Sequence, residues 1–272
     1  MKKTAVVVIP IYRKFVPSEA FSFSQCLKVL SRYDISLLHP ERLDLSDVLE
    51  STPPNVSEIV LPDSWFESIA SYNKLCLSPM FYGLYGDYEY MLIYQLDAFV
   101  FRDELADWCA MGYNYIGAPW LPNTNLYECS ICEVVRLIKR HVTPPGTTEH
   151  VSHAQMHYHV GNGGFSLRKV SKLKAVVTEH ARLIADMKEG ERRSMEDIFF
   201  SVYMSRRACI AIPEWREALR FAFESNSQRA FRLTGGRLPF GCHYWSRGDG
   251  WERFWYRYIA FDPRQDGAAF RR

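Results

Sequence analysis

The sequence has no long hydrophobic run, little excess of charge of either sign and no internal repeat. Its longest apolar run, residues 5–11, is far shorter than the roughly 20 residues that a membrane-spanning helix needs. Lys and Arg number 33 and Asp and Glu 31, so the formal net charge is only +2. Proteins that bind nucleic acid are usually much more basic. We therefore expect neither a membrane span nor a nucleic-acid partner.

The sequence also lacks the pattern of a secretion signal. Residues 1–4 begin with two lysines, but the apolar stretch that follows stops at Pro10 and contains no small-residue cleavage site. We therefore expect a cytoplasmic protein. In a reducing compartment its seven cysteines, an odd number, are expected to be mostly free thiols.

What is present is typical of a globular protein of 272 residues, with 47% hydrophobic and 15% aromatic residues. Apolar runs bounded by proline or glycine predict strands over residues 3–12, 35–38, 59–61, 90–101, 113–117 and 160–167. Helical spacing predicts helices over residues 18–33, 71–85, 104–111, 170–187 and 194–205, of which the first and last begin at capping residues Ser18 and Ser194. This alternation predicts a mainly parallel α/β sheet in one domain over residues 1–272.

Two segments stand apart from this alternation. Residues 123–157 are mostly polar and include Pro144-Pro145-Gly146, which indicates an insertion or lid, with one helix over residues 131–141. Residues 250–272 are aromatic and basic, so they either pack on the domain or lie at a membrane surface. The second alternative would place the protein peripherally at the inner face of the membrane.

Asp97 lies within the most apolar of the predicted strands. A carboxylate there is costly to bury without a cation or hydrogen-bond donors. Either Asp97 ligates a divalent metal that holds a diphosphate, or it caps a turn or pairs with Arg102.

Three further motifs each allow a functional and a purely structural interpretation. The glycines of residues 161–164 permit close approach of a ligand or form a bulge. Glu196 and Asp197 lie where a helix dipole favours carboxylates, but Asp197 is also a candidate general base. His243 is a candidate metal ligand or a hydrogen-bonded residue near the core.

A structural zinc site is a competing interpretation of the insertion. Its cysteines follow CxxC spacing and its histidines HxxxH spacing, although the gap between the pairs is longer than in a zinc finger. The alternative is free thiols and surface histidines. The four candidate ligands are Cys129, Cys132, His153 and His157.

The order of these motifs resembles that of glycosyltransferases of the GT-A fold. The resemblance is closest to a bacterial and fungal family catalogued as a domain of unknown function with a glycosyltransferase-like fold. It covers residues 4–245 and rests on VVVIPIYR, SYNKLCLS, YMLIYQLDAFVFRDEL, YNYIGAPW, VGNGGFSLRK, MEDIFFS and LPFGCHYW.

The resemblance implies a role for each matching position. Asp97 and His243 match the metal ligands, Asp197 the catalytic acid of a late Glu-Asp motif, and Glu196 its neighbour. The positions that match the nucleotide- and donor-binding residues are Pro10, Ile11, Tyr12, Arg13, Asn73, Lys74, Gln95, Asp97, Gly163 and Gly164. The implied cofactor is Mn²⁺ or Mg²⁺. One departure is Gln95, which replaces the first acid of the Asp-x-Asp motif, so metal binding is expected to be weak or to require the nucleotide.

The sequence thus predicts a hexosyltransferase that takes a sugar from a nucleotide donor, with UDP the commonest nucleotide in this fold. The acceptor would be a glycan or a lipid-linked molecule, as in polysaccharide synthesis. A single base at Asp197 predicts inversion at the anomeric carbon. Two alternatives are an inactive binding module, suggested by Gln95, and a nucleotidyltransferase, disfavoured because no glycine follows the first strand.

Overall fold

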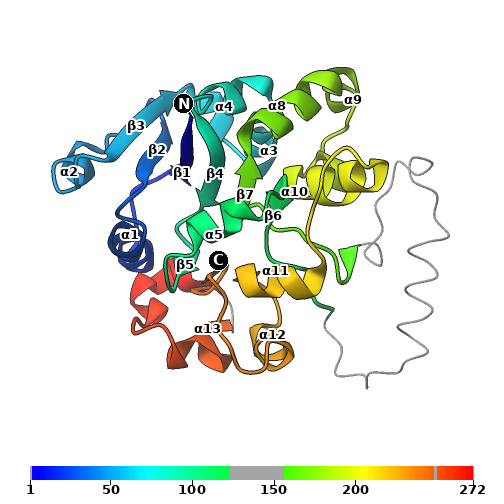
Figure 1. The fold of residues 1–272 in the computed structure, drawn as a ribbon. Coiled ribbons are helices and arrows are strands. Elements are labelled where there is room, and N and C mark those ends of the chain that lie inside the picture. Colours follow the sequence, from blue (N-terminus) through cyan, green and yellow to red (C-terminus); the bar gives the residue numbers. More distant parts are fainter. Residues whose placement is uncertain (1, 123–155, 248–249, 272) are drawn as a thin grey trace.

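The structure, a computed structural model, describes residues 2–122, 156–247 and 250–271. Within these residues six strands form one sheet in the order β3-β2-β1-β4-β7-β6 (Figure 1). The first four are parallel, whereas β7 is antiparallel to both β4 and β6. This is the mainly parallel α/β sheet that the sequence predicts. The strands are β1 (Lys3–Pro10), β2 (Asp34–Pro40), β3 (Val56–Leu61), β4 (Tyr88–Tyr94), β6 (Tyr115–Ile116) and β7 (Phe165–Lys169).

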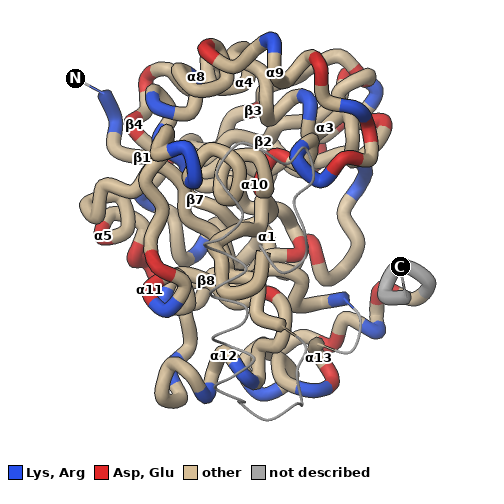
Figure 2. Tube along the Cα trace, turned by 90° about the vertical axis from the view of Figure 1, so that its right-hand side faces the viewer, with Lys and Arg blue, Asp and Glu red and all other residues tan. Residues whose placement is uncertain are grey.

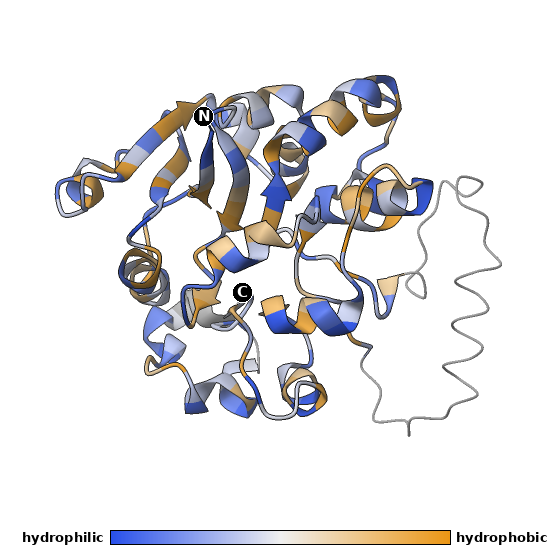
Figure 3. Ribbon diagram, in the orientation of Figure 1, coloured by the Kyte–Doolittle hydropathy of each residue, from blue (hydrophilic) through white to orange (hydrophobic). Residues whose placement is uncertain are grey.

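The central strands are apolar on both faces because helices cover both sides of a parallel sheet. Val7, Val8 and Ile9 of β1 are fully buried between β2 and β4, with Val7 opposite Leu92. The α-helices are α1 (Pro17–Val29), α2 (Ser46–Leu49), α3 (Ile69–Cys76), α4 (Pro79–Gly83), α5 (Leu105–Ala110), α8 (Val170–Glu179), α9 (Ala181–Ala185), α10 (Glu196–Ile198), α11 (Trp215–Phe221), α12 (Ser227–Leu233) and α13 (Gly250–Arg253). The longer helices, such as α1 and α8, bury one face, and apolar and polar residues alternate along the helices in Figure 3.

Shorter helical turns connect several of these elements. The 3₁₀ turns are η1 (Asp63–Phe66), η2 (Arg192–Ser194), η4 (Ser205–Arg207), η5 (Trp255–Arg257) and η6 (Pro263–Arg271), and η3 (Phe199–Met204) is a π-helix. The predicted helix over residues 194–205 is therefore divided among η2, α10, η3 and η4. Ser194 does not cap it, because its hydroxyl donates to the carbonyl of Glu191.

Three further strands of the described residues form a second, smaller sheet. Its strands are β5 (Phe99–Val100), β8 (Ala222–Phe223) and β9 (Gly241–Cys242), in the order β5-β9-β8. β9 is antiparallel to β5 and parallel to β8. This sheet packs with α11, α12 and residues 254–259 in a hydrophobic cluster separate from that of the large sheet.

The predicted strand over residues 90–101 is two strands. β4 ends at Tyr94, and the chain turns at residues 95–98 before β5 joins the smaller sheet. A continuous strand would have placed Gln95 and Asp97 in the sheet interior, where polar groups without partners are costly. The turn instead directs both side chains into a pocket described below.

The other predicted helices also differ in their ends. The helix predicted over 71–85 breaks at Ser78, whose hydroxyl caps α4 ahead of Pro79. The helix predicted from Ser18 begins at Pro17, and Ser18 is not its cap, because its amide and hydroxyl donate to Asp266. The helix predicted over 170–187 is interrupted at His180.

The aromatic residues near the C-terminus contribute to the core. Phe254, Trp255 and Ile259 are buried, and Tyr256 is exposed. This agrees with the packed alternative for the segment, and membrane contact stays a prediction. None of the helices in the described part of the chain is long and apolar enough to cross a bilayer.

Basic and acidic residues are interspersed along the described trace in Figure 2. Three of the four zinc-site candidates, Cys129, Cys132 and His153, lie outside the described residues, as does nearly all of the predicted lid over 123–157. The cysteines that the structure does describe are free thiols, and they are Cys26, Cys76, Cys109, Cys209 and Cys242.

Candidate functional site

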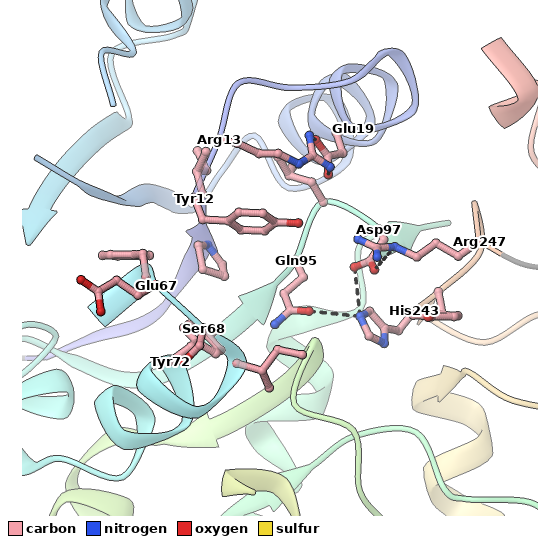
Figure 4. A pocket seen from close by; sticks show the side chains of 16 residues that line it. Tyr12, Arg13, Glu19, Glu67, Ser68, Tyr72, Gln95, Asp97, His243 and Arg247 are labelled. Atoms are coloured by element: carbon pink, nitrogen blue, oxygen red, sulfur yellow. Dashed lines mark hydrogen bonds and ion pairs between the residues drawn. The ribbon is translucent and has the colours of Figure 1, made fainter. Parts of the chain in front are cut away.

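A pocket of about 520 Å³ opens at the carboxyl ends of β1 and β4, where the loops after these strands meet α3 and the segment after β9 (Figure 4). Ligands of open α/β sheets usually bind at this edge. His243 lines the pocket, as do six of the residues predicted to bind the donor, namely Pro10, Ile11, Tyr12, Arg13, Gln95 and Asp97.

Asp97 is a buried carboxylate held by two cations. Its Oδ1 lies 3.0 Å from Nε2 of His243, and its Oδ2 lies 3.0 Å from Nε of Arg247. Burial alone would raise the pKa of Asp97, but the charges of His243 and Arg247 outweigh it and lower the pKa. The predicted pairing with Arg102 is wrong, because Arg102 pairs with Glu104 instead.

His243 has polar partners on both ring nitrogens. Nε2 faces Asp97 and also lies 3.3 Å from Oε1 of Gln95, while Nδ1 lies 3.3 Å from Oε1 of Glu224. Burial would lower the pKa of this imidazole, but Asp97 and Glu224 raise it to about 10. As the site stands the ring is therefore an imidazolium, and Nε2 would have to lose its proton to bind a cation.

The smaller sheet explains why residues so distant in sequence meet here. Asp97 lies in the turn before β5, His243 follows β9, and Glu224 follows β8. Because β9 is antiparallel to β5, the end of β9 lies beside the start of β5, where Phe99 pairs with Cys242. Because β8 is parallel to β9, the residues that follow both strands leave at the same edge.

The donor atoms at this edge fit a divalent cation. Octahedral ligands about 2.1 Å from an ion lie about 3.0 Å from one another, close to the separations of His243 Nε2 from Asp97 Oδ1 and Gln95 Oε1, which are 3.0 and 3.3 Å. Across the described ranges no three His, Cys, Asp or Glu side chains group as metal ligands, and the third donor here is an amide oxygen. With a single carboxylate, the site would need the charge of a bound diphosphate.

Gly163 and Gly164 make room for two of these side chains. A Cβ on Gly164 would lie 2.1 Å from Nε2 of His243, and one on Gly163 would lie 1.9 Å from Oε1 of Glu196. Both glycines are therefore required by close approach of the His243 ring and the Glu196 carboxylate. The two residues predicted to border the donor sugar thus separate His243 from the Glu-Asp motif.

Glu196 is fully buried against an arginine. Its Oε1 lies 2.7 Å from Nη2 of Arg168, which has no exposed surface. The same guanidinium nitrogen donates to the carbonyl of Gly163. The amide of Glu196 donates to Oδ1 of Asn73 at 2.9 Å, so Asn73 supports the Glu-Asp turn and does not line the pocket.

Asp197, the next residue, is a carboxyl whose pKa is raised to about 7. Desolvation is the main cause, followed by the charge of Glu196, with a smaller contribution from Glu224. The amide of Ile198, which donates to its Oδ1 at 2.8 Å, and the charge of Arg168 act in the opposite direction. A carboxyl that titrates near neutral pH is suited to accept a proton from a substrate hydroxyl.

Of the residues predicted to bind the donor, one lysine lies outside the pocket and one arginine is already paired with a carboxylate. Lys74 is exposed outside it, with Nζ 3.9 Å from a carboxylate oxygen of Glu189. Arg13 lines the pocket, but its guanidinium forms two hydrogen bonds of 2.8 Å with Glu19. A phosphate-binding role for Lys74 stays a prediction that this arrangement does not support.

The sequence interpretation missed Arg247, Glu224 and Arg168. Arg247 follows His243 by four residues, and its charge so close to a candidate metal ligand was an available signal. Glu224 and Arg168 left no such signal, because Glu224 is a single charge after a two-residue strand and Arg168 lies within a five-residue strand.

Comparison with known proteins places this geometry in context. A family model described as "Protein of unknown function (DUF5672)" matches residues 55–243. No curated protein matches the chain. Among solved structures, a galactosyltransferase LgtC in complex with donor and acceptor sugar analogues is 13% identical, with a TM-score of 0.52 over 88% of this chain and 86% of LgtC.

A second similar structure is the apo-form glycosyltransferase GlyE of Streptococcus pneumoniae TIGR4. It is 14% identical, with a TM-score of 0.52 over 98% of this chain and 62% of GlyE. At identities this low the likeness shows the fold alone. The fold is the GT-A glycosyltransferase fold, as the sequence motifs predicted.

Proposed function

Because this chain belongs to the DUF5672 family, whose function is unknown, we propose an activity from its site: transfer of a sugar from a nucleotide donor, UDP-linked, to a hydroxyl of a glycan or lipid-linked acceptor. One observation carries the proposal. Gln95, Asp97 and His243 converge at one wall of a pocket at the carboxyl edge of the sheet. Asp197, whose pKa is raised to about 7, follows Glu196, which lies against Gly163.

The donor would lie with its nucleoside toward the end of β1 and its diphosphate at Asp97 and His243. The exposed ring of Tyr12, half of whose surface is open, offers a face on which a base can stack. Bound Mn²⁺ or Mg²⁺, held by Asp97, His243 and the amide oxygen of Gln95, would supply Lewis-acid neutralisation of the leaving diphosphate. Arg247 adds a fixed positive charge at the same wall.

Transfer needs a proton acceptor on the other side of the sugar. The acceptor oxygen forms a bond to the anomeric carbon while the bond from that carbon to the diphosphate oxygen breaks. The nucleoside diphosphate leaves with the electron pair, and the acceptor proton passes to the carboxylate of Asp197. Direct displacement inverts the anomeric configuration, so a retained configuration in the product NMR spectrum would contradict this assignment of Asp197.

Donor binding is tested by thermal shift with a panel of sugar nucleotides, with and without Mn²⁺. A matching donor at about 100 times its Kd stabilises by about 2.7 kcal/mol, which raises Tm by on the order of 5 °C. Replacing Tyr12 with alanine is expected to weaken donor binding by about tenfold through lost stacking. The matched control is Tyr256→Ala, since Tyr256 is equally exposed but lies away from the pocket.

Release of the nucleoside diphosphate, measured alongside, separates an enzyme from a binding module. Tm shifts without metal-dependent release would favour the inactive module suggested by Gln95. Absence of any shift across the panel would contradict nucleotide-sugar binding in either form.

Restoring an acid at position 95 is expected to strengthen the cation site. Gln95→Glu keeps the side-chain length and places a second negative charge near Asp97, so the affinity for Mn²⁺ in the presence of UDP should rise by about tenfold. Gln228→Glu, on the exposed face of α12, is the control. Mn²⁺ titration followed by electron paramagnetic resonance measures both, and equal affinities would argue against Gln95 as a ligand.

A further inference from the structure

Glu224 contacts His243, and neither the sequence motifs nor the comparisons assign it a role. It directly follows β8, and the amide of His243 donates to the carbonyl of Phe223 at 2.9 Å, which fixes the two segments side by side. The turn after Glu224 is held by Asn226, whose side-chain amide donates to the carbonyl of Leu121. Only 22% of the Glu224 side chain is exposed.

On one side, Glu224 faces the imidazole of His243. Its Oε1 lies 3.3 Å from Nδ1, so the N–H at that position donates to a carboxylate. The opposite nitrogen, Nε2, is then the one directed at Asp97 and Gln95. Once Nε2 has lost its proton, a carboxylate on the other side keeps the remaining proton on Nδ1 and fixes the ring orientation, which makes Nε2 a better ligand for a cation.

The charge of Glu224 also contributes to the raised pKa of Asp197. The other charged groups that act on Asp197 are Glu196, its neighbour on α10, and Arg168 on β7. Of the negative charges, Glu224 is the one that also contacts His243.

We propose that Glu224 is a positioning residue for His243. It holds the ring with Nε2 toward the cation and diphosphate. The proposal rests on the proposed glycosyltransferase function. It adds a residue that is not among those lining the donor pocket.

Two variants separate orientation from charge. Glu224→Ala removes both the hydrogen-bond acceptor and the charge, so Mn²⁺ affinity in the presence of UDP is expected to fall by about 10- to 100-fold. Glu224→Gln keeps an amide oxygen for Nδ1–H and should recover most of that affinity. Electron paramagnetic resonance of Mn²⁺ measures this without turnover, and Glu214→Gln, an exposed glutamate before α11, is the control.

Glu224→Gln nevertheless lacks the negative charge that contributes to the raised pKa of Asp197. The acidic limb of its pH profile for kcat/KM is therefore expected to move to lower pH, whereas Glu214→Gln leaves the profile unchanged. A variant that merely loosened the fold would lower activity without moving this limb. Circular dichroism and Tm establish that each variant is folded.

The outcomes distinguish a failure of the role proposed for Glu224 from a failure of the proposed function. If the wild-type protein binds Mn²⁺ and UDP, and Glu224→Ala does so with equal affinity and an unchanged pH profile, the role of Glu224 is overturned while the proposed function stands. If the wild-type protein neither binds this pair nor releases UDP from any sugar nucleotide, both are overturned.

Discussion

Replacing Asp197 with asparagine is expected to lower kcat for sugar transfer by about 10²- to 10⁴-fold, the usual contribution of a positioned general base. Asparagine keeps the oxygen that accepts the amide of Ile198, so the local turn is preserved. Donor affinity should be nearly unchanged, because Asp197 does not line the donor pocket. Steady-state kinetics and a donor titration measure the two effects separately, with Asp107→Asn on the exposed face of α5 as the control.

The pH dependence of the wild-type protein follows from the same carboxyl. The base form is needed for proton transfer, and the pKa of Asp197 is raised from 3.8 to about 7. Activity should therefore rise with pH through about 7 and level off above it. A rate that is flat between pH 5 and pH 8 would contradict Asp197 as the base.

Asp197→Asn is also expected to raise Tm at pH 8. An acid whose pKa is higher in the folded protein than in the unfolded chain binds more protons when folded, so its ionisation makes the folded state less stable as pH rises from about 4 through 7. Asparagine does not ionise, so the variant does not lose stability in this way as pH rises. A gain in stability together with a loss of rate is the signature of a residue kept for chemistry. A fall in Tm with unchanged kcat would indicate a structural role.

Replacing Asp97 with asparagine is expected to remove metal-dependent donor binding. The variant loses the only carboxylate among the three converging donor atoms, and it leaves the cations of His243 and Arg247 without their shared partner. UDP affinity in Mn²⁺ should fall by about 100-fold or more. Because Asp97 is buried, the free energy of unfolding should also fall, by on the order of 1–3 kcal/mol given the partial exposure of Arg247.

The measurement is a calorimetric titration of UDP with and without Mn²⁺, again with Asp107→Asn as the control. Tm measured before titration shows how much of the loss reflects unfolded protein. Donor affinity equal to that of the wild-type protein would count decisively against Asp97 as the centre of the site.

The sequence predicts the large sheet well because its strands contain apolar runs that can be recognised without knowledge of the rest of the chain. Residues 3–10 and 88–94 are apolar enough that only burial on both faces satisfies them. The predictions failed where a single polar group or proline decides the outcome. The turn at Gln95 to Asp97 ends β4, and Pro79 divides the predicted helix over 71–85.

The candidate site is predicted only in part, for a physical reason. Asp97, Asp197 and His243 lie in motifs with their own local composition, so resemblance could identify them. Glu224 and Arg247 acquire their roles from the smaller sheet, whose strands have two residues each and show no periodicity. Pairing of such short strands is decided by tertiary packing, which a linear pattern does not encode.

The smaller sheet also bears on how the protein matures. The large sheet is complete once residue 169 has been made, but Gln95 and His243 are 148 positions apart, and contacts of such separation form late. A nascent chain that ends before β9 would therefore contain the large sheet, but its Asp97 would lack the positive charges of His243 and Arg247. The last fifth of the chain therefore supplies the residues that complete the candidate site, so the site forms only when folding is complete.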